Sequence, residues 1–272
     1  MNIINEFFGI IIRGIYDITS GNYALAIIIF TILTKVILFP LTYKQLRSTK
    51  EMNKIKPKYD EIIKKYKSDK QKQGEEVAKL YSEHKINPLG GCLPLLIQIP
   101  LILAIFAIVR QPLTYVVNMP QEEINIYTAK YLNKEEVNEK EANTYEIQVA
   151  KQNNFIDMRF IGLNLGDIPA DAFSKDPVKK ANIYSLLIPI LSVLASMYQI
   201  KRMQKSSQMT EEQKEMQKSM NLTMPILSGV ISYTMPLGLG IYWLLGSIIQ
   251  ILQQIVIDKL LKEDKEDRLL LK

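Results

Sequence analysis

The stretch YALAIIIFTILTKVILFPLT, residues 23–42, decides the fold of this chain. It is long and apolar enough to cross the hydrocarbon core of a bilayer as a helix. Lys35 is the exception, because a lysine within such a helix costs roughly 2.5–3.5 kcal/mol on insertion scales unless its ammonium reaches water or a counter-charge. The sequence therefore predicts a membrane-spanning helix with a functional cation inside it.

The composition of the whole chain conceals two populations of residues. The 272 residues are 47% hydrophobic and 23% charged, with a net charge of +6, averages that suit a soluble protein. Apolar blocks alternate with lysine–glutamate blocks, however, and Leu93–Val109 has only Gln98 as a strongly polar side chain. Helices of soluble proteins show polar faces at every turn, so buried core helices are the weaker interpretation. We expect an all-α polytopic membrane protein.

Five apolar blocks are close to the roughly 20 residues that a span needs. We expect spans at residues 22–42, 89–110, 181–200, 222–237 and 239–257. Residues 43–88 hold thirteen Lys/Arg against seven acids, whereas residues 111–180 hold eight against eleven. Because basic residues concentrate on the cytoplasmic side, the segments 43–88, 201–221 and 258–272 are predicted inside. The N-terminus and the acidic loop 111–180 are then predicted outside the cell membrane.

Two further helical elements are expected outside the spans. Residues 1–21 place polar side chains at three-to-four spacing among apolar ones, which predicts an amphipathic helix lying in the outer interface. A sixth span is the alternative, against which the three charges of this segment argue. Residues 43–88 predict a basic cytoplasmic helical hairpin, with Pro57 in the first turn of its first helix. This hairpin is either a docking arm for an acidic or RNA-bearing partner or a solvated linker.

Polar side chains also recur at helical spacing on the predicted spans. Thr31 lies one turn before Lys35, and Thr34 is close to the same face. The other spans contribute Gln98; Ser192, Ser196 and Gln199; Ser232; and Trp243, Gly246 and Gln250. Serine and glycine also permit close helix packing, which is the alternative for each residue taken singly. Polar stripes on all five helices favour a hydrated cavity around Lys35.

Residues that carry metal or covalent chemistry are scarce. Cys92 is the single cysteine and His84 the single histidine, so Cys/His metal clusters and thiol–imidazole pairs are excluded. The sequence contains neither a phosphate-cradling glycine loop nor a G-x-S-x-G motif. We therefore expect no enzyme activity, no metal site and no cofactor.

Three segments resemble a single family of membrane proteins. NPLGGCLPLLIQIP (residues 87–100), FIGLNLGD (160–167) and GIYWLLGSIIQILQQ (240–254) are similar to the bacterial YidC/Oxa-type membrane protein insertases. The resemblance covers nearly the whole chain apart from residues 121–154. It implies a positively charged hydrophilic groove, open to the cytoplasm and to lipid, that guides one- or two-span proteins with short tails into the membrane.

The resemblance also assigns residues and partners. The groove cation of the family falls on Lys35, its threonine on Thr31, its second-span glutamine on Gln98 and its last-span aromatic on Trp243, with Gln199 a looser correspondence. The cation is usually arginine, so lysine keeps the charge but loses the planar donor fork.

The implied partners are nascent membrane proteins with acidic translocated tails, the ribosome or targeting factors at the hairpin and the tail, and the Sec translocon. Two other classes stay open. One is a secondary transporter or channel with Lys35 as its counter-ion. The other is a polytopic scaffold that recruits partners through the basic hairpin.

Overall fold

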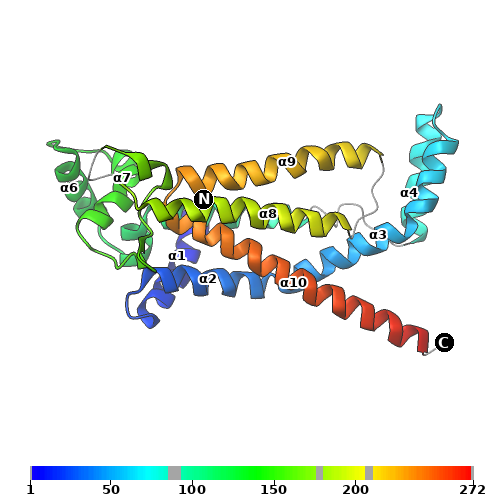
Figure 1. Ribbon diagram of the computed structural model, residues 1–272, viewed down its shortest axis with the longest axis horizontal. Helices are drawn as coiled ribbons and strands as arrows, with labels where there is room; N and C mark the ends of the chain where they lie inside the picture. Colours follow the sequence, from blue (N-terminus) through cyan, green and yellow to red (C-terminus); the bar gives the residue numbers. More distant parts are fainter. Residues whose placement is uncertain (1, 85–92, 176–179, 206–210, 271–272) are drawn as a thin grey trace.

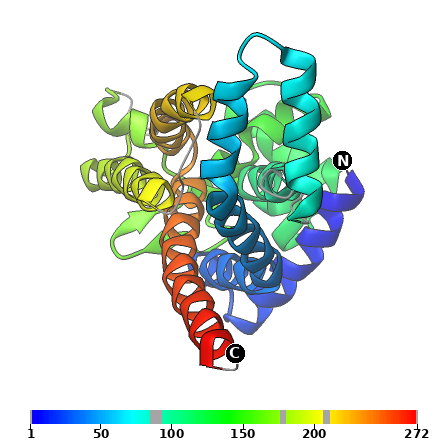
Figure 2. The ribbon, with the colours of Figure 1, turned by 90° about the vertical axis from the view of Figure 1, so that its right-hand side faces the viewer.

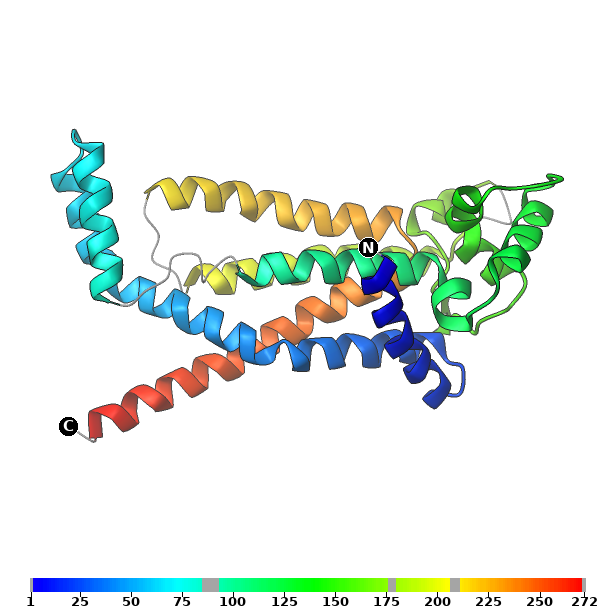
Figure 3. The ribbon, with the colours of Figure 1, turned by 180° about the vertical axis from the view of Figure 1, so that it is seen from behind.

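The computed structural model describes residues 2–84, 93–175, 180–205 and 211–270, without the side chains of residues 2, 93–98, 203–205, 211–220 and 262–270. Five helices run along its long axis (Figures 1 and 3): α2 (Tyr23–Ile37), α5 (Leu93–Arg110), α8 (Leu187–Lys205), α9 (Glu211–Thr234) and α10 (Leu237–Leu270). A helical hairpin stands at one end of this bundle, and shorter helices cover the other end. The predicted all-α class is confirmed, with one pair of two-residue strands as an addition.

α2 begins and ends at residues that interrupt helical hydrogen bonding. The Asn22 side chain caps its start by accepting a hydrogen bond of 2.9 Å from the Leu25 backbone N–H. At the other end Pro40, which lacks a backbone N–H, occupies the first turn of α3 (Phe39–Lys65). The axes of α2 and α3 differ by 51°. This bend leaves the last carbonyl groups of α2, including that of Lys35, in need of other donors.

α3 and α4 (Lys70–Glu83) form an antiparallel hairpin that projects from the bundle (Figures 1 and 2). The rings of Tyr59 and Tyr81 stack between the two helices, with their centroids 6.3 Å apart. Close to the turn, Gln73 Nε2 donates a hydrogen bond of 3.1 Å to the Ile63 carbonyl. The charged segment 43–88 therefore contains a packed helical pair.

One expectation about the hairpin is wrong. Pro57 lies inside α3 and not in its first turn. The physical reason is that Pro40 already begins the helix directly after the end of α2, so Pro57 falls in the middle of a continuous helix. A single proline there removes one backbone hydrogen bond, which the long helix tolerates.

Residues 111–180, predicted as a loop, fold largely into short elements. These are η2 (Leu113–Val117), α6 (Gln121–Leu132), α7 (Glu139–Gln152), η3 (Pro169–Phe173) and the strands β1 (Arg159–Phe160) and β2 (Leu163–Asn164), which pair antiparallel. Ile124, Ile147, Met158 and Leu165 are buried here and continue the hydrophobic core of the bundle. The segment is thus a packed layer that covers the end of the bundle opposite the hairpin.

Within this layer a buried acid joins α7 to η2, the short helix that follows α5. Glu146 of α7 is completely buried, and its two carboxylate oxygens accept the backbone N–H of Thr114 at 2.7 Å and the hydroxyl of Thr114 at 2.9 Å. Burial raises the pKa of Glu146 to about 7, although both hydrogen bonds from Thr114 act in the opposite direction.

The connection between α9 and α10 anchors the same layer. α9 ends at Thr234 and α10 begins at Leu237, so Leu237 belongs to the last helix and not to the fourth predicted span. The Leu237 N–H donates to the Asp167 carbonyl at 2.7 Å, and the Gly238 N–H donates to the Leu165 carbonyl at 2.9 Å. These bonds satisfy two of the N–H groups that the start of a helix leaves without partners.

The number of membrane spans is supported only in part. Among the described residues, Ile183–Arg202 and Leu237–Leu261 are long and apolar enough to cross a membrane, and α2 with α3 makes a third if the bent pair is one span. Ile99–Arg110 is a shorter apolar helix. Five spans at the predicted boundaries therefore stay a prediction.

The first helix, α1 (Asn2–Ile18), lies on the outside of the bundle (Figure 2). Two of its polar side chains turn inward: Asn5 Nδ2 donates to the Tyr115 hydroxyl and Arg13 to the Tyr115 carbonyl, both at 3.4 Å. Phe7 and Ile10 are 58% and 68% exposed on the other side. An outward apolar face suits a helix in contact with lipid. The position of α1 in the outer interface stays a prediction that agrees with this face.

Candidate functional site

Lys35 lies in the last turn of α2 and faces α10. Its ammonium donates a hydrogen bond of 3.1 Å to Oε1 of Gln250, and it takes part in none of the ion pairs between described residues. Gly246, one turn before Gln250, makes room for it: a Cβ at this glycine would lie 3.5 Å from Lys35 Cε. A half-buried cation therefore has an amide as its described partner, and its charge is not neutralised.

A second glutamine of α10 holds the backbone of the same residue. Gln253 Nε2 donates a hydrogen bond of 2.7 Å to the Lys35 carbonyl. This carbonyl belongs to the last turn of α2, where the bend before α3 removes helical donors. Gln253 was not among the predicted site residues; its place one turn from Gln250 on α10 was the available signal.

The two predicted threonines lie on the same face of α2 but bond within the helix. Thr31 is completely buried, and its hydroxyl donates to the Ile27 carbonyl at 2.7 Å. The Thr34 hydroxyl donates to the Thr31 carbonyl at 2.9 Å. Both hydroxyl hydrogens are thus engaged within α2, and each side chain keeps only its oxygen lone pairs for another partner.

Trp243 stands one turn before Gly246 on α10 and is half-buried, so spacing places it on the helix stripe that contains Gly246 and Gln250. Gln199 is half-buried on α8, which packs against α10. The side chain of Gln98 lies outside those described. The structure therefore brings Lys35, Gly246 and Gln250 into contact, and the groove roles of Trp243, Gln199 and Gln98 stay predictions.

The predicted serines lie where α8, α9 and α10 pack closely. Ser192 and Ser232 are completely buried, and Ser196 is 7% exposed. The Ser228 hydroxyl donates to the Ser192 carbonyl at 3.3 Å, from α9 to α8. A Cβ added at Gly240 of α10 would lie 3.5 Å from the Ser232 Cβ. Small side chains that let helices approach closely account for this placement, and a part in a hydrated groove stays a prediction.

Charge pairs appear farther along α10, toward the hairpin. Asp258 of α10 accepts Lys50 of α3 at 2.7 Å and Arg202 of α8 at 3.5 Å. One carboxylate thus joins three helices at the hairpin end of the bundle. Gln250, the partner of Lys35, lies eight residues before Asp258 on α10, which is about two helical turns.

The site consists of a lysine, two glutamines and a glycine between two apolar helices. Within the described ranges, no group of three or more His, Cys, Asp or Glu side chains is placed to hold a metal ion. With its long apolar helices, the structure defines an α-helical integral membrane protein that carries a cation between two of its helices.

The chain belongs to the family described as "60Kd inner membrane protein", which it matches over residues 14–265, and thereby to the YidC/Oxa-type insertases. The resemblance found in the sequence is confirmed. The protein is accordingly an integral protein of the bacterial inner membrane.

Relatives of this chain differ in length. A "Membrane protein insertase YidC" of Fusobacterium nucleatum is 33% identical over 258 residues, which cover 95% of this chain and 96% of the relative. A "Membrane protein insertase YidC 2" of Listeria innocua is 28% identical over 264 residues, 96% of this chain and 72% of the relative. A third, from Geotalea daltonii, is 50% identical over 95 residues, 35% of this chain and 18% of the relative.

Proposed function

We propose that the protein is a membrane protein insertase that uses Lys35 as the cation of a hydrophilic groove. The observation that carries this proposal is the contact between Lys35 and Gln250, a cation held by a neutral amide between two apolar helices. The relatives named as membrane protein insertases support the general activity. The hydrophilic groove and the class of substrate go beyond the names of these relatives and are part of our proposal.

An amide partner suits a cation that must attract a passing acid. A carboxylate at the position of Gln250 would neutralise the charge, whereas the glutamine oxygen orients the ammonium and leaves its charge effective. In surroundings of low dielectric constant this charge acts strongly on an acidic tail that enters the bilayer. The apolar segment of the substrate, leaving water for lipid, supplies the driving force.

The orientation we propose places the hairpin, residues 201–221 and the C-terminus in the cytoplasm, with the N-terminus outside. Its support is the excess of Lys/Arg in residues 43–88 and the acidic excess in residues 111–180. The layer over the far end of the bundle then closes the groove on the outer side. The end of the bundle that carries the hairpin stays accessible to substrates from the cytoplasm.

The hairpin is proposed as the docking arm for the ribosome or for targeting factors, together with the basic tail. Its thirteen Lys/Arg against seven acids favour encounters with RNA or acidic surfaces. The stacked Tyr59 and Tyr81 give the arm a fixed shape on which such charges can be presented. Cooperation with the Sec translocon is part of the same proposal.

The test is rescue of insertase-depleted bacteria by the full chain and its variants. We expect the wild type and Lys35→Arg to restore insertion of a one-span substrate with an acidic translocated tail. Lys35→Met, which keeps the length of the side chain and removes its charge, and Lys35→Ala are expected to fail. A substrate with a neutral tail is the matched control and should depend less on Lys35.

Two outcomes would contradict the proposal. Equal insertion by Lys35→Met and wild type would remove the charge from the mechanism. If the wild-type chain, expressed at a normal level, failed to restore insertion, an insertase function of this protein would be excluded. Solute flux into vesicles that Lys35→Met abolishes would favour the transporter.

A further inference from the structure

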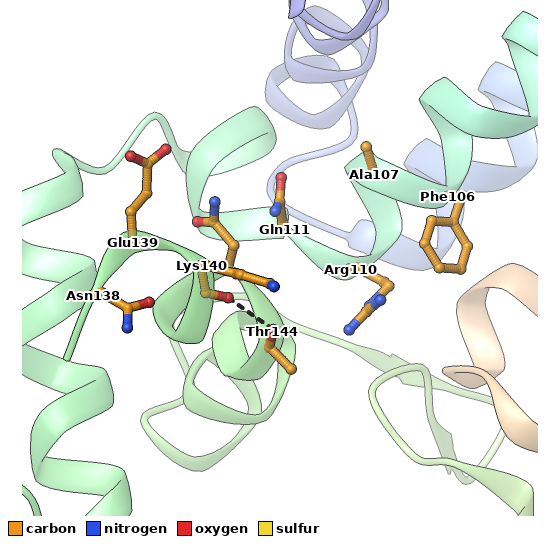
Figure 4. A pocket seen from close by; sticks show the side chains of 9 residues that line it. Phe106, Ala107, Arg110, Gln111, Asn138, Glu139, Lys140 and Thr144 are labelled. Atoms are coloured by element: carbon orange, nitrogen blue, oxygen red, sulfur yellow. Dashed lines mark hydrogen bonds between the residues drawn. The ribbon is translucent and has the colours of Figure 1, made fainter. Parts of the chain in front are cut away.

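A cavity of about 620 Å³ lies outside the groove, between the end of α5 and the start of α7 (Figure 4). It is at the end of the bundle opposite the hairpin, where α5 emerges from its apolar stretch. Phe106, Ala107 and Arg110 of α5 line one side, and Lys140, Asn143 and Thr144 of α7 line the other. The insertase proposal makes no use of it.

Two cations face this cavity without a carboxylate partner. Arg110 and Lys140 enter none of the ion pairs among the described residues, although Lys134 and Lys151 in the same layer pair with Glu141 and Asp167. Figure 4 shows the Lys140 side chain extending toward the side occupied by Arg110. Two like charges that share a space repel each other, and an anion between them relieves that repulsion.

The surrounding side chains leave the two positive charges effective. The Arg110 guanidinium lies 5.2 Å from the centre of the Phe106 ring, which orients it without neutralising it. Glu139 is the acid at the rim, and its carboxylate points away from Lys140 and Arg110 in Figure 4. The cavity is therefore a positively charged space.

An exposed apolar stripe leads from the bundle to these cations. Ile99, Leu103, Phe106 and Arg110 follow at spacings of four, three and four residues, which places them on one face of α5. Ile99 and Leu103 are 46% and 43% exposed. In an integral membrane protein such a surface faces acyl chains, and the stripe ends at Arg110, where the apolar segment of α5 gives way to polar sequence.

We propose that this cavity binds the headgroup of an anionic phospholipid, with one acyl chain along the stripe of Ile99, Leu103 and Phe106. The planar donor fork of Arg110 suits two phosphate oxygens, and Lys140 supplies a second charge from α7. The continuous apolar stripe favours a lipid over a free phosphate, which would leave this surface unused. The lipid then connects α5 to the layer that covers the bundle.

Native mass spectrometry of the full chain, stripped of lipid in detergent, tests this site. Phosphatidylglycerol and phosphatidylcholine are added in turn, and inorganic phosphate is added as a competitor. We expect one tightly retained phosphatidylglycerol, with retention reduced on the order of tenfold in Arg110→Gln/Lys140→Gln, which corresponds to about 1.4 kcal/mol. Lys130→Gln, an exposed lysine of α6 outside the cavity, is the matched control and should bind as the wild type does.

A second variant separates loss of charge from loss of fold. Ala107→Trp places a large side chain in the cavity and keeps both cations, and we expect it to reduce retention as well, with an unchanged thermal unfolding midpoint in the absence of lipid. Equal retention by the wild type and the double variant would overturn the proposal. Competition by inorganic phosphate, or equal binding of phosphatidylcholine, would overturn the assignment to an anionic lipid.

Discussion

The ammonium of Lys35 and the side-chain oxygen of Gln250 are 3.1 Å apart, although 215 residues separate them in sequence. Gln253, one turn later on α10, holds the carbonyl of the same lysine at 2.7 Å. α10 thus fixes both the backbone and the charge of Lys35 with neutral groups. A cation held in this way stays able to attract an external acid, which makes Gln250 the place to test the mechanism.

Gln250→Glu should neutralise the charge of Lys35, the groove cation, while the lysine itself stays in place. Two unit charges about 4 Å apart attract by about 4 kcal/mol at an effective dielectric constant of about 20, so an internal carboxylate competes with an acidic tail for Lys35. We expect insertion of acidic-tailed substrates to fall on the order of tenfold or more, measured by protease protection of the translocated tail.

The matched control at this position is Gln250→Leu. It removes the amide and leaves the lysine charge, so most insertion activity should persist. If Gln250→Glu inserts acidic-tailed substrates as fast as the wild type, the free charge of Lys35 has no part in insertion.

Thiol labelling tests whether the space around Gln250 contains water. In a Cys92→Ser background, Gln250→Cys should react with a membrane-impermeant maleimide added from the cytoplasmic side, because a thiol needs water to form its reactive thiolate. Leu252→Cys is the control: Leu252 is 55% exposed, more than the half-buried Gln250, but it is expected to face lipid. Faster labelling at position 252 than at position 250 would contradict a hydrated groove.

The contact between Lys35 and Gln250 shows how much of the site could be predicted from the sequence and how much could not. Helical spacing identified both residues as members of polar stripes, because spacing determines which face of its own helix a residue occupies. It does not determine which helices become neighbours. Gln253 shows this limit of helical spacing. Its partner is a backbone carbonyl that the bend before α3 leaves without a helical donor, and nothing in the sequence around position 253 indicates that bend.

The serines and the outer segment were harder to predict for other reasons. Ser192 and Ser232 fit a hydrated stripe and a close helix contact equally well by sequence, since both need small polar side chains. Residues 111–180 are rich in charge, which concealed that they contain a packed layer with Glu146 completely buried in it. The burial of Glu146 could not be predicted from the sequence, because it depends on the fold placing the hydrogen-bond donor Thr114 beside the carboxylate.

The contact between α8 and α9 at Gly229 should tolerate no side chain. A Cβ at Gly229 would lie 2.8 Å from Val193 Cγ2, and valine is too stiff to move aside. We expect Gly229→Ala to destabilise the protein by about 1–3 kcal/mol through overpacking, measured by thermal unfolding in detergent micelles.

Val193→Ala provides the compensating change for a double-mutant cycle. With the valine methyl groups removed, Gly229→Ala should no longer clash and should gain up to about 1 kcal/mol from the better helix propensity of alanine. The two substitutions are therefore expected to be strongly non-additive. Simple additivity would mean that the helices separate freely at this contact.

Glu146 should make the stability of the protein depend on pH. Its pKa rises from 4.5 in the unfolded chain to about 7 in the folded protein because of burial. The unfolded state therefore loses its proton first as the pH rises, and stability falls between these two values and then stays level. At about 1.4 kcal/mol per pKa unit, the loss amounts to roughly 3 kcal/mol.

Glu146→Gln should remove this dependence and stabilise the protein above pH 7. Its amide oxygen can accept the Thr114 N–H while its nitrogen donates to the Thr114 hydroxyl, so both contacts persist without a charge. Thermal unfolding from about pH 5 to about pH 8 measures the effect. Glu139→Gln, an exposed acid of the same helix, should keep the wild-type profile. The same profile in Glu146→Gln would assign the pH dependence to another group.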